Sequence, residues 1–125
     1  MTPAPIAIVS AMHEELRALL PALGLVRVVR LGGREFHCGS VHGHAVVLVL
    51  SGIGKVAAAT TAALLIHEFK ARALVFTGVA GGLRPGVKVG DVVVAQQLLQ
   101  HDMDASPLFP RFEVPLFRSW STGSK

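Results

Sequence analysis

Apolar residues along this chain occur in short continuous runs that stop at glycine or proline. The run at residues 6–11 has the pattern of a strand buried on both faces. Residues 74–76 predict a second buried strand, and residues 45–50 and 91–95 predict further apolar strands. Residues 26–41 alternate apolar and polar positions more loosely, and Gly32-Gly33 and His42-Gly43 are typical turn sequences. We therefore expect a pair of meander strands that lead into the run at residues 45–50.

Two other segments have helical patterns. The first, residues 13–23, carries one apolar stripe at helical spacing, formed with Met12 before it, and we expect it to end or kink at Pro21. The second, residues 55–70, is apolar around nearly its whole circumference, so we expect it to be largely buried. Strands that alternate with helices predict an α/β fold with a largely parallel sheet.

Glycines follow two of the predicted strands. One corner is Ser51-Gly52-Ile53-Gly54, which opens the second helix, and the other begins at Thr77-Gly78. Glycine has no Cβ, so a ligand can approach the backbone there. At the first corner the amides that open the helix also have no partner within it. The two corners predict a small-molecule site along one edge of the sheet.

Glu15 lies at the border of the first helix's apolar stripe, whereas Glu14 projects nearly opposite it. A partly desolvated carboxylate near a strand end can have a raised pKa and can act as a general base. The alternative is an acid that only stabilises the first helical turn through the helix dipole. Spacing alone leaves both interpretations open.

Composition narrows the class of protein. The 125 residues predict one domain, with 51% hydrophobic and 16% charged residues against about 25% charged in typical domains. We therefore expect part of the apolar surface to face another subunit or further polypeptide. The net charge is +4, but no basic run or patch of the kind that binds nucleic acid is visible.

Several features predict a cytoplasmic protein. Cys38 is the single cysteine, which fits a reducing compartment. The N-terminus lacks the basic region of a signal peptide, and the apolar stretch at residues 56–66 is too short to span a membrane. We expect no association with a membrane.

Other chemistries fit the motifs less well. Gly52, Gly54 and Ala57 match the glycine pattern of a dinucleotide fold, but no acid follows about twenty residues later. His101, Asp102 and Asp104 could bind a divalent ion, although hydrogen bonds that pin a loop are the simpler interpretation. No nucleophile–histidine–acid set is evident, and we expect neither a metal nor a cofactor.

Four stretches in this order resemble one enzyme family: residues 10–15 (SAMHEE), 51–59 (SGIGKVAAA), 77–83 (TGVAGGL) and 89–94 (VGDVVV). Together with His101-Asp102 they resemble the N-terminal half of bacterial 5′-methylthioadenosine/S-adenosylhomocysteine nucleosidases, in the purine nucleoside phosphorylase superfamily. The resemblance covers about residues 5 to 115. Each motif alone is weak, whereas the ordered set is specific.

The resemblance implies an incomplete three-layer αβα fold with a mixed sheet, a homodimer of the full-length protein, and hydrolysis of the N-glycosidic bond of a purine nucleoside. It gives Glu15 the role of positioning and activating the attacking water. The residues that it implies for substrate binding are Met12, Ile53, Val79, Ala80, Gly81 and Phe109. Phe109 belongs to a loop that would close the pocket of the neighbouring subunit.

Two departures from the family matter. Val79 stands where some members have a serine, and the chain has about half the family's length. By the resemblance, a ribose-binding Met-Glu segment and the aspartate that protonates the purine lie in the other half. We therefore expect residues 1–115 to form half of the enzyme domain, weakly active or inactive alone, and residues 116–125 to be an unrelated disordered tail. A phosphorolytic enzyme, a futalosine-type hydrolase and a non-catalytic nucleoside-binding or dimerisation module remain alternatives.

Overall fold

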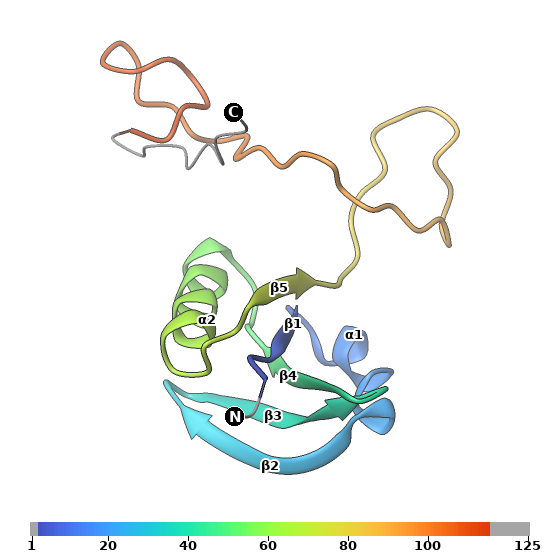
Figure 1. Ribbon diagram of the computed structural model, residues 1–125. Helices are drawn as coiled ribbons and strands as arrows, with labels where there is room; N and C mark the ends of the chain where they lie inside the picture. The colour runs from blue at the N-terminus through green and yellow to red at the C-terminus, as the bar shows by residue number, and fades with distance from the viewer. Residues whose placement is uncertain (1–2, 116–125) are drawn as a thin grey trace, which may run out of the picture. The chain divides into compact units, whose positions relative to one another are not determined.

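The computed structural model describes residues 3–115, which fall into two compact units (Figure 1). The division lies between Gly81 and Gly82. We call residues 3–81 the sheet unit and residues 82–115 the second unit, and describe each by itself. Within residues 3–115, all the regular helices and strands belong to the sheet unit.

The sheet unit is built on a mixed five-stranded sheet in the order β2-β3-β4-β1-β5 (Figure 1). The strands are β1 (Ile6–Ser10), β2 (Gly24–Leu31), β3 (Arg34–Val41), β4 (His44–Leu50) and β5 (Ala73–Phe76). β1 runs parallel to β4 and to β5, whereas β2, β3 and β4 form an antiparallel meander. The expected meander is confirmed, and both of its turns have the positive φ angles of tight hairpins, at Gly32-Gly33 and His42-Gly43.

Helices pack on both faces of the sheet, which gives the expected three layers. Successive β4 residues point to opposite faces. Val47 and Val49 join the cluster that includes Leu65 of α2 (Lys55–His67), and Leu48 joins the cluster that includes Leu16 of α1 (His13–Arg17). The mixed sheet with its helices confirms the predicted fold class.

The first helix is shorter than its apolar stripe predicts. α1 ends at Arg17, and a single 3₁₀ turn, η1 (Leu20–Ala22), follows it. Pro21 explains the early end, because proline has no N–H to donate to the carbonyl four residues earlier and its ring clashes with that carbonyl. That carbonyl belongs to Arg17. Leu16 and Leu23 are nevertheless both buried, so the stripe still packs on the sheet.

Two expectations of burial are wrong for the sheet unit. Only Thr61 and Leu65 of α2 are buried, and Val56 is 82% exposed, because only one side of this helix packs on the sheet. The strand at residues 74–76 was expected to be buried, yet all four residues of β5 are exposed. β5 is an edge strand, and among the described residues its only strand neighbour is β1.

The second unit consists of turns. The strand expected at residues 91–95 is absent, and Val92 and Val94 are 92% and 91% exposed. An extended segment without a neighbour has no partner for its backbone amides and carbonyls, so no ladder forms. The tail expected at residues 116–125 lies outside the described residues.

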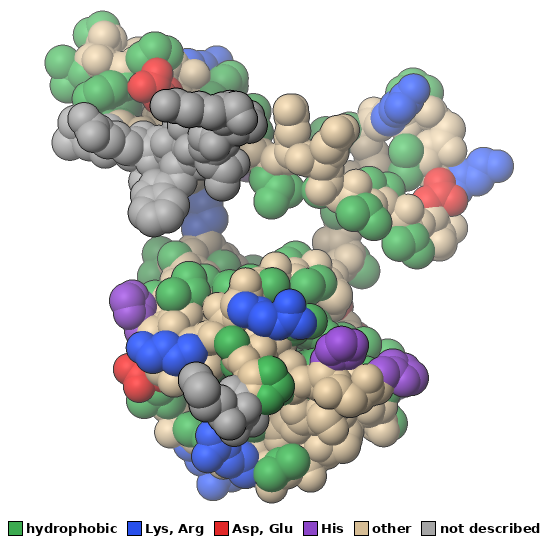
Figure 2. All heavy atoms as spheres, in the orientation of Figure 1, with side chains coloured by type: hydrophobic (Ala, Val, Ile, Leu, Met, Phe, Trp, Pro, Cys, Tyr) green, Lys and Arg blue, Asp and Glu red, His purple; other side chains and the backbone are tan. Residues whose placement is uncertain are grey.

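The charged surface agrees with the scattered pattern in the sequence. Figure 2 shows Lys and Arg side chains spread over the visible face of the sheet unit rather than gathered in one patch. Among residues 3–115, no helix combines the length and the apolar character that crossing a membrane requires.

Candidate functional site

The carboxyl ends of the three parallel strands are joined by hydrogen bonds. The Ser51 amide donates to the Ser10 carbonyl at 2.8 Å, and the Thr77 amide donates to the Val9 carbonyl at 2.9 Å. The buried Ser10 hydroxyl also lies 2.9 Å from the Thr77 hydroxyl, so a side-chain hydrogen bond connects the ends of β1 and β5. The two glycine corners therefore flank the end of β1.

Glu15 lies at this edge because α1 begins directly after β1. Its Oε2 accepts hydrogen bonds from the amides of Ala11 and Met12, both at 2.9 Å. Its Oε1 accepts a third from the amide of Val79 at 3.0 Å, across 64 residues of sequence. One carboxylate thus binds the start of its own helix and the corner that follows β5.

These amides set the direction of the Glu15 pKa. The Met12 amide lowers it most, followed by the Val79 amide, while partial desolvation acts in the opposite direction and the Ala11 amide adds a further lowering. The net pKa lies below the ordinary value of 4.5. The expected possibility of a raised pKa is therefore wrong, because hydrogen bonds to the charged form outweigh its desolvation. Glu15 is ionised at neutral pH.

Gly78 makes room for the carboxylate. A Cβ added at this position would lie 3.0 Å from Glu15 Oε1 and 3.3 Å from Glu15 Cδ. It would also lie 3.0 Å from the Phe76 ring. A side chain at residue 78 would therefore push against the group that the Val79 amide holds.

The other residues expected at the site differ in how closely they approach Glu15. Met12 and Val79 adjoin the carboxylate through their amides, and Ala80 and Gly81 continue the chain from Val79. Ile53, 80% exposed, lies at the Ser51 corner between Gly52 and Gly54, which have φ angles of 79° and 108°.

Phe109 belongs to the second unit, where its amide donates to the Ala105 carbonyl at 3.2 Å. Its expected part in closing a neighbouring pocket stays a prediction.

Sequence reasoning missed the roles of Ser10, Thr77 and Gly78. The sequence offered one signal for this pair: Ser10 and Thr77 are small hydroxyl residues at the ends of two predicted strands. That they face each other depends on the pairing of β1 with β5, which the linear pattern does not specify.

In the polar cluster at residues 101–104, Asp104 makes hydrogen bonds that pin its own loop. Asp104 Oδ1 accepts hydrogen bonds from both the amide and the hydroxyl of Ser106. The Ser106 hydroxyl is the main cause that lowers the Asp104 pKa, and the Ser106 amide adds to it. Across residues 3–115, no three His, Cys, Asp or Glu side chains are grouped so that they could hold a metal ion.

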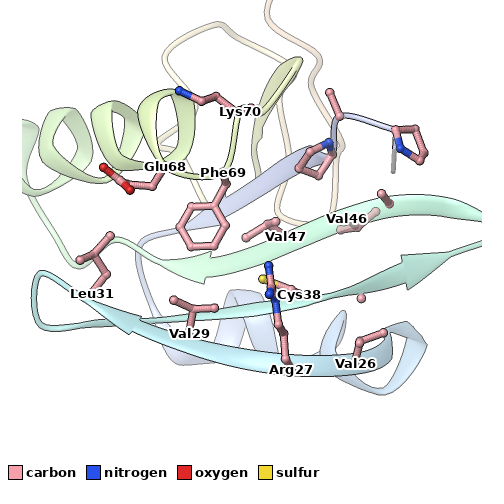
Figure 3. Close-up of a pocket in the computed structure, with 15 residues that line it drawn as sticks. Val26, Arg27, Val29, Leu31, Cys38, Val46, Val47, Glu68, Phe69 and Lys70 are labelled. Carbon is pink, nitrogen blue, oxygen red and sulfur yellow. The ribbon is translucent and has the colours of Figure 1, made fainter. Parts of the chain in front are cut away.

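A hollow of about 910 Å³ lies at the other end of β1 (Figure 3). Its lining includes Pro5, which precedes β1, together with Val29, Cys38 and Val47 of the sheet and Phe69 after α2. Figure 3 shows the Phe69 ring and the side chains of Val29, Cys38 and Val47 around this space. Glu15 and the glycine corners do not line it. This hollow is thus separate from the edge where the candidate chemistry lies.

Comparison with known proteins finds one matching family model. The model described as "Phosphorylase superfamily" matches residues 5–121.

Solved structures agree with this match. The chain is similar to a 5′-methylthioadenosine/S-adenosylhomocysteine nucleosidase from Neisseria meningitidis, solved in complex with methylthio-immucillin-A, at 38% identity and a TM-score of 0.88. That match covers 93% of this chain and 51% of the solved one. The corresponding enzyme of Streptococcus pneumoniae, in complex with 8-aminoadenine, is 39% identical with a TM-score of 0.86, and 90% and 50% are covered.

A futalosine hydrolase from Helicobacter pylori is nearly as similar. It is 36% identical with a TM-score of 0.83, and the match covers 90% of this chain and 49% of the solved one. The chain therefore spans about half the length of the solved structures that it matches.

Proposed function

Because this chain belongs to the phosphorylase superfamily, we propose that it is the first half of a nucleosidase that hydrolyses the N-glycosidic bond of 5′-methylthioadenosine and S-adenosylhomocysteine. In this proposal Glu15 orients the attacking water. The substrate is bound by Met12, Ile53, Val79, Ala80 and Gly81, and the loop around Phe109 closes the pocket of a second subunit in a homodimer.

The observation that carries the proposal is the Glu15 carboxylate, fixed by amides from two strand ends. An ionised carboxylate accepts about four hydrogen bonds. Three are donated by the backbone, so further acceptor capacity is left for a water at the sheet edge. The lowered pKa keeps Glu15 in its accepting form at neutral pH. The lowered pKa also makes Glu15 a weak base, so its role is to orient the water rather than to accept the proton of the water.

Cleavage also requires chemistry that Glu15 does not supply. As the bond to the purine breaks, positive charge develops on the sugar, and the carboxylate stabilises this charge. The departing purine needs a proton, and general acid catalysis typically contributes about 10²–10⁴-fold. The chain spans about half the length of the solved relatives, and by the family resemblance the aspartate that donates this proton lies in the other half. We therefore expect the 125-residue chain alone to be weakly active or inactive.

A second candidate is hydrolysis of futalosine. The Helicobacter pylori futalosine hydrolase is 36% identical to this chain, within a few per cent of the two nucleosidases.

The test is a chimera in which residues 3–115 replace the matched segment of the Neisseria meningitidis nucleosidase. We expect it to release adenine from methylthioadenosine without added phosphate. Glu15→Gln should lower kcat by about 10²–10⁴-fold. Glu14→Gln, the matched control on the exposed side of α1, should change kcat by less than about twofold.

The outcomes separate the proposals. Equal losses from the two substitutions would refute the role of Glu15. A strict requirement for phosphate would indicate phosphorolysis, and a preference for futalosine would favour the second candidate. Binding of methylthioadenosine by calorimetry without turnover in any chimera that folds would indicate a non-catalytic module.

A further inference from the structure

The hollow at the amino end of β1 has the size and the lining of a small-molecule site. Its volume of about 910 Å³ lies within the range of about 300–1,000 Å³ that is typical of ligand pockets. Val29 of β2, Cys38 of β3 and Val47 of β4 line it from three neighbouring strands, and Phe69 lines it from the segment after α2 (Figure 3). Apart from three charged residues, the lining is apolar or glycine. Such a space can remove the apolar part of a ligand from water.

The walls are held by the core, so the hollow is formed before a ligand arrives. The Phe69 ring stacks on the ring of Phe36, which is fully buried, with 4.5 Å between the ring centroids. Val47 is 3% exposed and belongs to the same core cluster. The chain after α2 is also fastened, because the Arg72 amide donates to the Pro5 carbonyl at 2.9 Å. Binding in a preformed site orders few additional side chains, which favours affinity.

Arg27 is directed to the hollow by the register of the meander. It lies opposite Cys38 in the pairing of β2 with β3, and Cys38 lies opposite Val47 in the pairing of β3 with β4. Residues opposite each other in antiparallel strands share a face of the sheet, and Figure 3 shows the Arg27 side chain reaching toward the other two. None of the described residues forms a hydrogen bond or ion pair with this side chain, whereas Arg30 of the same strand pairs with Glu35 at 2.8 Å. The Arg27 guanidinium is therefore available to an anion.

The three charged residues of the lining indicate the chemistry of the ligand. Arg27 and Lys70 are cations and Glu68 is an acid, so the lining has a net charge of +1. A polyanion such as a nucleotide needs several donors, which the apolar walls do not supply. A single carboxylate instead matches one guanidinium, which can donate two parallel hydrogen bonds to it. The lining therefore suits an alkyl chain that ends in a carboxylate.

We propose that this hollow is a second binding site, for a medium-chain monocarboxylic acid. The alkyl chain lies against Val29, Val47 and Phe69, and the carboxylate binds Arg27 at the rim. The site is separate from Glu15, so the proposal does not depend on the nucleosidase activity.

Binding is tested on the 125-residue chain with decanoate, below the concentration at which it forms micelles. We expect a saturable heat by calorimetry, with affinity that rises roughly tenfold from octanoate to decanoate as two more CH₂ groups are buried. Cys38 is the single cysteine and lines the hollow, so saturating decanoate should slow its alkylation by iodoacetamide about tenfold. No binding at millimolar decanoate would overturn the proposal. Binding that leaves the alkylation rate unchanged would also overturn it, because the ligand would lie elsewhere.

Matched substitutions test the role of the charges. Arg27→Gln should weaken octanoate binding by about threefold or more but leave the binding of uncharged octan-1-ol unchanged. Arg30→Gln is the control, because Arg30 does not line the hollow, and it should leave both affinities unchanged. Glu68→Gln removes the negative charge of the lining and should strengthen octanoate binding by about twofold. A gain of affinity cannot result from damaged folding. Equal effects of Arg27→Gln and Arg30→Gln, or no gain in Glu68→Gln, would refute the charge assignment.

The chimera of residues 3–115 with the rest of the Neisseria meningitidis nucleosidase tests whether further polypeptide occupies the hollow. We expect this chimera to bind decanoate with nearly the affinity of the 125-residue chain. Binding by the chain but not by a folded chimera would overturn the proposal, because the added polypeptide would then fill the space. Adenine release is measured separately: a chimera that binds decanoate without releasing adenine upholds the second site and contradicts the proposed function.

Discussion

The hydroxyl pair of Ser10 and Thr77 holds the ends of β1 and β5 together, and its loss should be measurable as stability. Thr77→Val preserves the shape of the side chain but removes the partner of the Ser10 hydroxyl, which is fully buried. A buried hydroxyl left without a hydrogen bond costs about 1–3 kcal/mol. Ser10→Ala leaves the Thr77 hydroxyl, which is only half-buried and can reach water, so we expect a smaller cost of about 0.5–1.5 kcal/mol.

Urea unfolding followed by circular dichroism, with a thermal melt, gives these free energies. For a unit of this size, a loss of about 2 kcal/mol lowers Tm by roughly 8–16 °C. The double variant should be less destabilised than the sum of the single variants, with a coupling of about 1 kcal/mol. Thr77→Ser keeps the hydroxyl and is the control, expected to retain the coupling.

The same experiment reports on the candidate site. Thr77 is two residues from Val79, whose amide binds Glu15, so loosening the β5 end should let the Glu15 pKa rise toward its ordinary value. An NMR titration of the carboxyl carbon measures this shift. A coupling near zero, or an unchanged Glu15 pKa in Thr77→Val, would refute the idea that the hydroxyl pair aligns the site.

Three further predictions follow from the same geometry. Because the folded-state pKa of Glu15 is lowered, its contribution to stability is fully present above the ordinary value of 4.5 and disappears as the pH falls through the lowered pKa. Glu15→Gln should therefore remove this part of the pH dependence of the urea midpoint. An unchanged dependence of the midpoint on pH would contradict this prediction. Gly78→Ala should displace the Glu15 carboxylate and raise the Glu15 pKa in an NMR titration. Gly81→Ala is the control, because its added Cβ meets nothing within 4 Å and should leave the Glu15 pKa unchanged. Equal shifts of the Glu15 pKa in the two variants would exclude a steric cause. Leu65→Ala should destabilise the sheet unit by about 2–5 kcal/mol in urea unfolding, because the Leu65 side chain is fully buried. Ile66 is 49% exposed, so Ile66→Ala should destabilise the unit much less. Similar losses of stability in the two variants would show that the buried face of α2 is misassigned.

Local sequence patterns predicted most of the sheet unit because they report periodicity and turn chemistry. The apolar runs located β1 and β4, and the turns at Gly32-Gly33 and His42-Gly43 located the meander. The early end of α1 could also have been derived from Pro21 and the carbonyl of Arg17. The apolar pattern could not show that, among residues 3–115, β5 pairs on one side only and residues 91–95 pair with no strand. The sequence of a strand records the burial that it is suited to, not whether a partner is present.

For the candidate site, the sequence by itself determined which glutamate borders the apolar stripe and which strand ends carry glycine. Only the tertiary structure decided the state of that glutamate. Its pKa depends on the Val79 amide, 64 residues away, which reaches Glu15 because β5 pairs with β1 and Gly78 leaves space. The same pairing brings the Ser10 and Thr77 hydroxyls together. Hydrogen bonds between distant segments arise from the register of the sheet, and that register is set by the packing of the whole unit.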